Sequence, residues 1–394
     1  MPVLNFDYKN ATRIVFGKGQ IAKLTELVPK DKKILMCYGG GSIKRNGVYD
    51  QVMTALKGWD ITEFSGIEAN PDYETLIKAV AIVKELGPEN VFVLSVGGGS
   101  VADGCKFVCA AAVYTKSTDY YGDICQRGVP IEAAVPLGVV LTLPATGSES
   151  NGNAVISYRA KHMKYCMASP LVYPVWAILD PETTMSLPTR QTANGVVDSC
   201  VHVCEQYVTD CINADVQDRY SEALLKVLID NGALVMKEPN SYVARANIMW
   251  AAMVAQNNST GVGRAQDWGT HHMDNEIGIL YGASHGAGLA LLFPYWMMYA
   301  MKTQGPTLFA KYASRVWGIP MDFEHPELTA MEGIKAFQRF VKEDLGMPTT
   351  ISELGGKEED IPKMVENMFY EAPNHGNFVK LTPEIAAEIY KMAL

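Results

Sequence analysis

A carboxylate and an imidazole lie one helical turn apart in an otherwise apolar segment of this sequence. Asp198, His202 and Glu205 share one face of the helix that the pattern predicts over residues 191–209, while Val197, Val201, Cys204 and Val208 share another. Burying these polar groups is costly unless something binds them, and a divalent metal ion would do so. A salt bridge inside a helical core is the alternative that this pair alone leaves open.

A second segment supplies more side chains of the metal-binding type. Three of the seven histidines, His271, His272 and His285, fall between residues 267 and 286. Asp198, His202, one of the adjacent pair and His285 would make a site with one carboxylate and three imidazoles. That donor set suits Fe(II) or Zn(II), and expansion to five ligands leaves a position for substrate. The remaining histidines lack such neighbours and are expected at the surface: His162, His325 and His375.

Two triple-glycine loops, each following a β-rich run, are candidate nucleotide contacts. A loop without side chains lets the backbone approach a phosphate closely, and the helix that follows offers free N–H groups and a positive dipole end. The geometry of a strand-to-helix turn is the alternative explanation for either loop alone. Neither loop matches the Gly-x-Gly-x-x-Gly or Walker pattern, which disfavours generic Rossmann and kinase-like folds. The two loops are Gly39, Gly40, Gly41 and Ser42, and Gly97, Gly98, Gly99 and Ser100.

Polar residues near these loops indicate which cofactor they bind. Asp103 starts the helix after the second loop, where it would cap the backbone or hold a ribose or nicotinamide group. The first loop continues into Lys44 and Arg45, and its tip carries no acidic residue to hold a ribose 2′-hydroxyl. We therefore predict NADP(H) in preference to NAD(H). A third cluster at the end of a predicted strand, where open α/β sheets bind ligands, contributes Thr142, Thr146 and Asn151.

The elements that carry these residues alternate in the first half of the chain and are helical in the second. β-rich runs at 33–38, 61–64, 90–96 and 138–143 alternate with helical patterns such as 73–86 and 101–114, which predicts an α/β domain with a parallel sheet. Beyond residue 181 the chain is rich in Ala, Met, Leu and Glu, with few β-branched clusters. We predict a dinucleotide-binding α/β domain over residues 1–184 and an all-helical metal-binding and substrate domain over residues 185–394.

Composition excludes several classes of protein. The 394 residues are 48% hydrophobic and 20% charged with a net charge of −9, so neither disorder nor binding to nucleic acid or an anionic membrane is expected. The longest apolar run, 288–300, is too short to span a bilayer, and the first residues show no secretory signal, so a cytoplasmic location is expected. The eight cysteines have no Cys-x-x-Cys spacing; Cys200 and Cys204 are expected to be core residues rather than a redox or metal pair.

These motifs together resemble the iron-containing (type III) alcohol dehydrogenases, and within them the NADPH-using butanol dehydrogenase and broad-range aldehyde reductase branch. The resemblance covers nearly the whole chain. It implies that a metal and a nicotinamide cofactor meet between the two domains, that a small aldehyde or primary alcohol is the substrate, and that the protein is a homodimer. It also implies the metal ligands Asp198, His202, His271 and His285. The segments that carry it are 38–47, 97–106, 142–149 and 179–181, with the spacings Asp198-x3-His202 and His271-x13-His285.

One position departs from the family pattern. Many members carry a second histidine four residues after the third ligand, whereas this chain has Asn275 before Glu276. That histidine is often assigned to proton delivery, so the proton path needs another donor. His272 is our hypothesis, because a helix over 268–277 would place it near the same face as Asn275. The alternatives are that His272 packs in the core or replaces His271 as the ligand.

A different enzyme class shares this architecture by resemblance, namely the metal- and NAD-dependent sugar-phosphate cyclases of the dehydroquinate synthase type. These enzymes need several Lys or Arg residues around the metal to hold a phosphate. The segments that carry the candidate ligands here offer Trp268, Met273 and Tyr281 and few cations. The sequence therefore favours an alcohol dehydrogenase over a cyclase or a non-catalytic protein.

Overall fold

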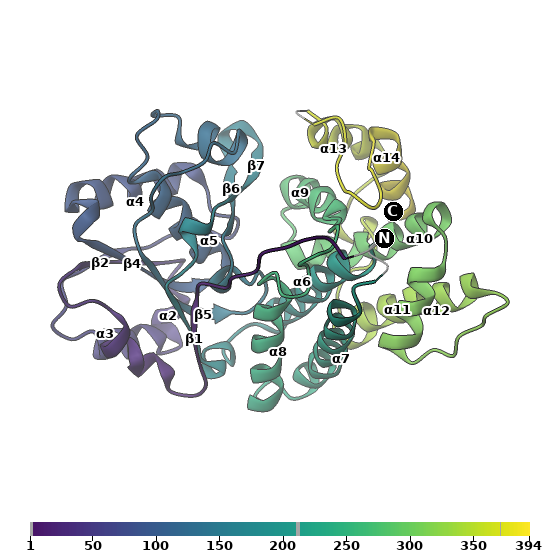
Figure 1. Cartoon of the computed structure of the whole chain (residues 1–394), viewed down its shortest axis with the longest axis horizontal. Helices are drawn as coiled ribbons and strands as arrows, with labels where there is room; N and C mark the ends of the chain where they lie inside the picture. The colour runs from purple at the N-terminus through teal and green to yellow at the C-terminus, as the bar shows by residue number, and fades with distance from the viewer. Residues whose placement is uncertain (1–2, 210–212, 371) are drawn as a thin grey trace. The chain divides into compact units, whose positions relative to one another are not determined.

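The four β-rich runs become neighbouring strands of one parallel sheet in the computed structural model, which describes residues 3–209, 213–370 and 372–394 (Figure 1). Two short strands that the sequence analysis missed complete the sheet in the order β1-β8-β5-β4-β2-β3. The α/β prediction is confirmed. The strands are β1 (Arg13–Phe16), β2 (Lys33–Tyr38), β3 (Ile61–Phe64), β4 (Val91–Gly98), β5 (Leu137–Leu143) and β8 (Trp176–Leu179).

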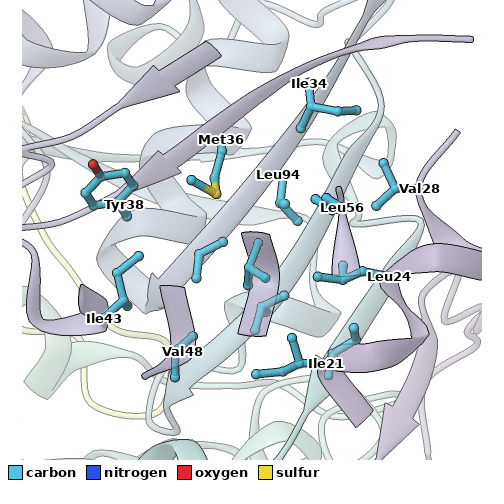
Figure 2. Packing of buried hydrophobic residues seen from close by; sticks show 14 of the residues in the cluster. Ile21, Leu24, Val28, Ile34, Met36, Tyr38, Ile43, Val48, Leu56 and Leu94 are labelled. Carbon is cyan, nitrogen blue, oxygen red and sulfur yellow. The ribbon is translucent and has the colours of Figure 1, made fainter. Parts of the chain in front are cut away.

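The central strands are apolar on both faces because helices cover both sides of the sheet. Alternate residues of β2 and β4 enter one core cluster with the segments that follow β1 and β2. In Figure 2, Ile34, Met36 and Leu94 point from the sheet towards Ile21 and Val48. This packing fixes where β2 and β4 end, and therefore where their glycine loops lie.

Helices and a hairpin surround the sheet. Asp72 caps α4 by accepting a hydrogen bond from the backbone N–H of Glu74, and Gly87 follows its last residue, so the helix has the bounds that the sequence predicts. An antiparallel hairpin of β6 (Asn153–Tyr158) and β7 (Met163–Ala168) interrupts the alternation and was not anticipated. The helices are α1 (Leu24–Leu27), α2 (Ser42–Arg45), α3 (Val48–Ala55), α4 (Tyr73–Leu86) and α5 (Gly99–Ala111).

The chain divides into two compact units near the texture change in the sequence. One unit is Lys9–Leu187, and the other is Pro188–Leu394 together with the residues up to Tyr8. The N-terminal residues thus group with the helices, whereas the sequence analysis assigned them to the α/β domain. The N-terminal residues contact the helical unit at Gly263: the Leu4 N–H donates to the Gly263 carbonyl at 2.9 Å, and Val3 and Phe6 lie beside this glycine.

The second unit is helical, as predicted. Valines, an alanine and two cysteines are buried along α6, and Ala, Leu and Met are buried along α10, with Pro294 inside that helix. Among the described residues, no helix is long and apolar enough to cross a membrane. Cys200 and Cys204 are buried and form no disulfide. The helices are α6 (Thr189–Tyr207), α7 (Asp215–Lys237), α8 (Tyr242–Ala255), α9 (Gly269–Tyr281), α10 (His285–Gln304), α11 (Thr307–Trp317), α12 (Pro326–Arg339), α13 (Ile361–Met368) and α14 (Pro383–Met392).

Candidate functional site

Helix α6 carries the first two candidate ligands on one buried face. Asp198 and His202 are one turn apart, with side chains only 4% and 6% exposed. The Asp198 Oδ1 and His202 Nε2 atoms are 3.6 Å apart, which is longer than a strong hydrogen bond. The helical face that the sequence predicts is therefore present, but the simple salt bridge that was its alternative is not well formed.

Helices α9 and α10 bring two more imidazoles to the same point. His271 lies in the first turn of α9, after Trp268, which adopts a left-handed backbone with φ 67°. His285 is the first residue of α10, just beyond the left-handed turn at Gly282. Their Nε2 atoms lie 3.9 Å and 3.5 Å from Asp198 Oδ1. The structure thus turns His271, and not its neighbour His272, towards Asp198.

The four side chains fit a metal ion. One donor atom from each of Asp198, His202, His271 and His285 lies within 4.8 Å of the others. Ligands about 2.0–2.2 Å from a tetrahedral ion are separated by about 3.5 Å, close to the spacings around Asp198 Oδ1. This oxygen is buried and accepts no hydrogen bond from any described residue. Burial lowers the pKa of His202 to about 4, which keeps the imidazole neutral as a ligand must be.

Two buried carboxylates orient the imidazoles from α9 and α10. Glu205, one turn after His202 on α6, pairs with Nδ1 of His271 and accepts a hydrogen bond from the Thr270 N–H at 2.8 Å. Asp274 pairs with Nδ1 of His285. Each contact leaves the Nε2 atom to face Asp198, the arrangement that metal-binding histidines usually show. Glu205 lies on the helical face that the sequence predicts for the ligands, but the sequence alone indicates no role for it.

Glycines after His285 permit this close approach of helices. A side chain at Gly288 would collide with the Asp274 carboxylate, and one at Gly286 would collide with the backbone of Asn194 on α6. Helix α10 can therefore pack directly on α6 and α9. The His271 and His285 side chains remain 16% and 27% exposed, whereas the Asp198 Oδ1 and His271 Nε2 donor atoms are buried.

His272 lies outside the group of four. It is exposed, and its ring packs on His375 with centroids 4.3 Å apart. His375 is not the isolated surface residue that the sequence suggests: it is partly buried, and its Nε2 atom is 2.8 Å from the Met368 carbonyl oxygen. Trp268 is the aromatic neighbour of the ligands, with its ring centroid 5.1 Å from that of His271.

The candidate cofactor residues gather at the carboxyl ends of β2, β4 and β5, which are adjacent in the sheet. Gly41 has φ 85°, a conformation that favours glycine. A side chain at Gly99 would come within 2.6 Å of Thr146 Cγ2, so the second loop packs directly on the Thr142–Asn151 segment. A side chain at Gly40 would meet nothing within 4 Å, which leaves open space beside the first loop.

Asp103 has two partners inside the protein. The Ser148 hydroxyl donates to Oδ1 at 2.5 Å and the Val155 N–H donates to Oδ2 at 2.9 Å. Both contacts join α5 to the segment after β5. Each oxygen of the Asp103 carboxylate therefore accepts a hydrogen bond from that segment, and the side chain does not cap α5. Nearby, the buried Lys106 ammonium donates to Asn151 Oδ1 at 2.9 Å, which holds the amide that the sequence analysis assigned to the cofactor.

One acidic residue near the first glycine loop was missed. Glu63 lies on β3, the strand beside β2, and its carboxylate accepts a hydrogen bond from the Tyr38 hydroxyl at 2.7 Å. The tip of the loop carries no acidic residue, as the sequence shows, but tertiary packing brings this acid from the next strand. Its distance along the chain, about 20 residues after the loop, is the signal that could have found it.

Comparison with known proteins gives matches along the whole chain. The profile of the "Iron-containing alcohol dehydrogenase" family matches residues 11–181, and that of the "Fe-containing alcohol dehydrogenase family, C-terminal" matches residues 192–394. The NADPH-dependent aldehyde reductase YqhD of Escherichia coli (strain K12) is 44% identical over 390 residues, 99% of each chain. NADH-dependent butanol dehydrogenase B of Clostridium acetobutylicum is 36% identical over 396 residues, 100% of each chain. A crystal structure of Escherichia coli K-12 YqhD superposes with a TM-score of 0.95 at 43% identity over 100% of both chains.

Proposed function

The chain belongs to the iron-containing alcohol dehydrogenase family, and from that premise we propose that it reduces small aldehydes to primary alcohols with NADPH. As a family member it is an oxidoreductase of the alcohol dehydrogenase and aldehyde reductase class. The observation that carries the proposal is the convergence of one carboxylate and three imidazoles within 4.8 Å in the helical unit.

We assign a divalent metal, Fe(II) or Zn(II), to this group. When both are bound, the metal supplies Lewis-acid polarisation of the carbonyl oxygen and the reduced nicotinamide supplies the hydride. The protein's own residues prepare the site. Glu205 and Asp274 hold Nδ1 of His271 and His285, so Nε2 of each ring faces Asp198 and would be available to hold the ion. His202 needs no deprotonation before it binds, because burial already keeps it neutral.

The proposed cofactor is NADP(H), bound at the two glycine loops and the Thr142–Asn151 segment. Lys44 and Arg45 after the first loop are exposed cations suited to a 2′-phosphate. Relatives do not agree on this property: YqhD is described as NADPH-dependent and butanol dehydrogenase B as NADH-dependent. We favour NADPH because the relative at 44% identity uses it and because Glu63 is already held by its neighbours.

Proton delivery and assembly complete the proposal. We propose that His272 or water donates the proton that the alkoxide takes up, since Asn275 stands where many family members have a histidine.

A homodimer is proposed from family resemblance. Molar mass by light scattering would test that assembly, and a monomer at assay concentrations would exclude it.

The sugar-phosphate cyclase alternative has less support. Trp268 packs beside His202 and His271, and the matched relatives are reductases and dehydrogenases.

A panel of short aldehydes and alcohols, assayed with NADPH and NADH on protein of known metal content, tests the function. Aldehyde-dependent loss of NADPH absorbance that requires the metal is the expected result. No turnover of any aldehyde or alcohol by metal-loaded protein would refute it.

A further inference from the structure

The Glu63 carboxylate is enclosed by three side chains from the surroundings of the first glycine loop. The Tyr49 hydroxyl donates to Oε1 at 2.6 Å, and the Tyr38 hydroxyl donates to Oε2 at 2.7 Å. Lys44 Nζ lies 3.5 Å from the same Oε2 atom and 4.5 Å from the ring centroid of Tyr49. Both carboxylate oxygens are therefore occupied by donors.

Glu63 corresponds in chain interval and strand to the acidic residue that dinucleotide-binding folds use for ribose, although the loop itself lacks the Gly-x-Gly-x-x-Gly pattern. Tyr38 ends β2 immediately before Gly39, and Lys44 lies in α2 immediately after the loop. In dinucleotide-binding folds, an acidic residue about 20 residues after the glycine loop accepts a hydrogen bond from the 2′-hydroxyl of NAD, and it repels the 2′-phosphate of NADP. Glu63 follows the first loop by about that interval, on the neighbouring strand β3.

The carboxylate stays charged and within reach of solvent. Burial acts to raise the pKa of Glu63, but the hydrogen bonds from Tyr49 and Tyr38 and the charge of Lys44 outweigh it, so the pKa is lowered. The Glu63 and Lys44 side chains are 35% and 48% exposed. A ligand beside the first loop would therefore meet the Glu63–Lys44 ion pair. Each oxygen of the Glu63 carboxylate in this pair already accepts a hydrogen bond.

We propose that Tyr49, Tyr38 and Lys44 mask Glu63, and that this mask sets the preference for NADPH over NADH. With the mask in place, each carboxylate oxygen already accepts a hydrogen bond from a tyrosine, so a 2′-hydroxyl has to compete with Tyr49 or Tyr38 for it. Lys44 balances the charge of Glu63 beside a 2′-phosphate. Tyr49 is a positioning residue, since it acts on the cofactor through Glu63. The inference rests on the proposed function, because it deepens the assignment of the first glycine loop to the adenosine end of NADP(H).

Replacing Tyr49 by Phe tests the mask with a change of one hydroxyl. Among the described residues, Tyr49 is the one that donates a hydrogen bond to Glu63 Oε1. Tyr49→Phe removes this donor and leaves Tyr38 and Lys44 on Oε2. The freed oxygen accepts the 2′-hydroxyl of NADH, so the ratio of Kd for NADH to Kd for NADPH falls about tenfold, the effect of one hydrogen bond to a charged group. Direct titration of nicotinamide fluorescence gives both Kd values, and kcat/KM for both cofactors should follow.

Two further variants make the result specific. In Tyr49→Phe/Glu63→Gln the tenfold change should disappear, because the carboxylate that recognises the hydroxyl is gone. Tyr114→Phe is the matched control: it removes a tyrosine–carboxylate hydrogen bond, 2.9 Å to Asp123 Oδ2, at a position beyond the end of α5 in the same unit. That variant should keep the wild-type ratio.

The outcomes separate this inference from the proposed function. A Kd ratio within twofold of wild type in Tyr49→Phe, with or without a lower Tm, would refute the proposed mask. The Tyr49–Glu63 hydrogen bond would then be only a structural contact between α3 and β3. The same would follow if the shift persisted in the double variant. If wild-type protein binds both cofactors but reduces no aldehyde, the proposed function fails, while the ratio of Kd values still decides the mask.

Discussion

Each of the four donor residues, Asp198, His202, His271 and His285, is expected to be needed for metal binding. Asp198 and His202 are buried on α6, and removing either would leave an incomplete donor set. We expect His285→Ala to lose both bound metal and turnover, because one of four donors is gone. His325→Ala is the control, since His325 is exposed and pairs only with Glu327 at 3.4 Å among the ion pairs of the described residues. Metal analysis and an NADPH assay check both, and a His285→Ala protein with normal metal and activity would remove the metal mechanism.

Glu149 predicts a pH dependence of stability. Its side chain is 1% exposed, no other described residue donates a hydrogen bond to either oxygen, and burial raises its pKa from 4.5 to about 7. Between these two pH values the folded protein binds the proton more tightly than the unfolded chain, so this residue's contribution to stability falls as pH rises through that window.

Glu149→Gln should therefore stabilise the protein at pH 8 by up to about 3 kcal/mol and have little effect near pH 4.5. Chemical denaturation at several pH values measures the difference from wild type. The exposed Glu85→Gln change should show no such trend. A difference for Glu149→Gln that does not vary with pH would contradict the assignment.

His272 remains a hypothesis for proton delivery, and His272→Asn distinguishes three roles. A lowered kcat and an altered pH profile with full metal content would support a proton donor, for which a loss of about 100-fold is typical. Unchanged kinetics would make it a bystander that packs on His375. Loss of metal would make it a ligand, contrary to the position of His271 beside Asp198.

At the scale of elements, we expect the second glycine loop to matter for packing and the first for cofactor binding. Alanine substitutions distinguish these two roles. Gly99→Ala should cost about 1–3 kcal/mol of stability, because the new methyl group collides with Thr146. Gly40→Ala meets no neighbour within 4 Å, so the free energy of unfolding should stay near that of wild type while NADPH affinity falls. Denaturant unfolding and cofactor titration measure the two effects. Unchanged NADPH affinity in Gly40→Ala would place the phosphates elsewhere.

At the scale of the whole molecule, the candidate metal donors lie in only one of the two units, so we expect metal binding to stabilise that unit. All four donors lie in α6, α9 and α10 of the helical unit. Chelation should lower the Tm, and metal at 100 times its Kd should restore about 2.7 kcal/mol. Hydrogen exchange should increase in peptides from these three helices and stay constant in β2, β4 and β5. Equal exchange changes in both units would contradict this local coupling.

Local patterns in the sequence determine most elements and many candidate residues. The bounds of β2, β3 and α4 follow from β-rich runs, an N-cap and a glycine stop, and the i, i+4 spacing of Asp198 and His202 follows from helical periodicity. Such signals act between residues a few positions apart, so they can be read without knowing the fold. Short strands such as β1 and β8 gave too weak a signal and were missed.

Tertiary structure alone decides which distant side chains meet. The residues by themselves left His271 and His272 equivalent, and only the packing of α9 on α6 turns His271 towards Asp198 and Glu205. Asp103 points to Ser148 and Val155, and Glu63 reaches Tyr38 and Tyr49, because neighbouring strands place them there. These contacts depend on how elements far apart in the chain pack together, and no spacing within one segment encodes that arrangement.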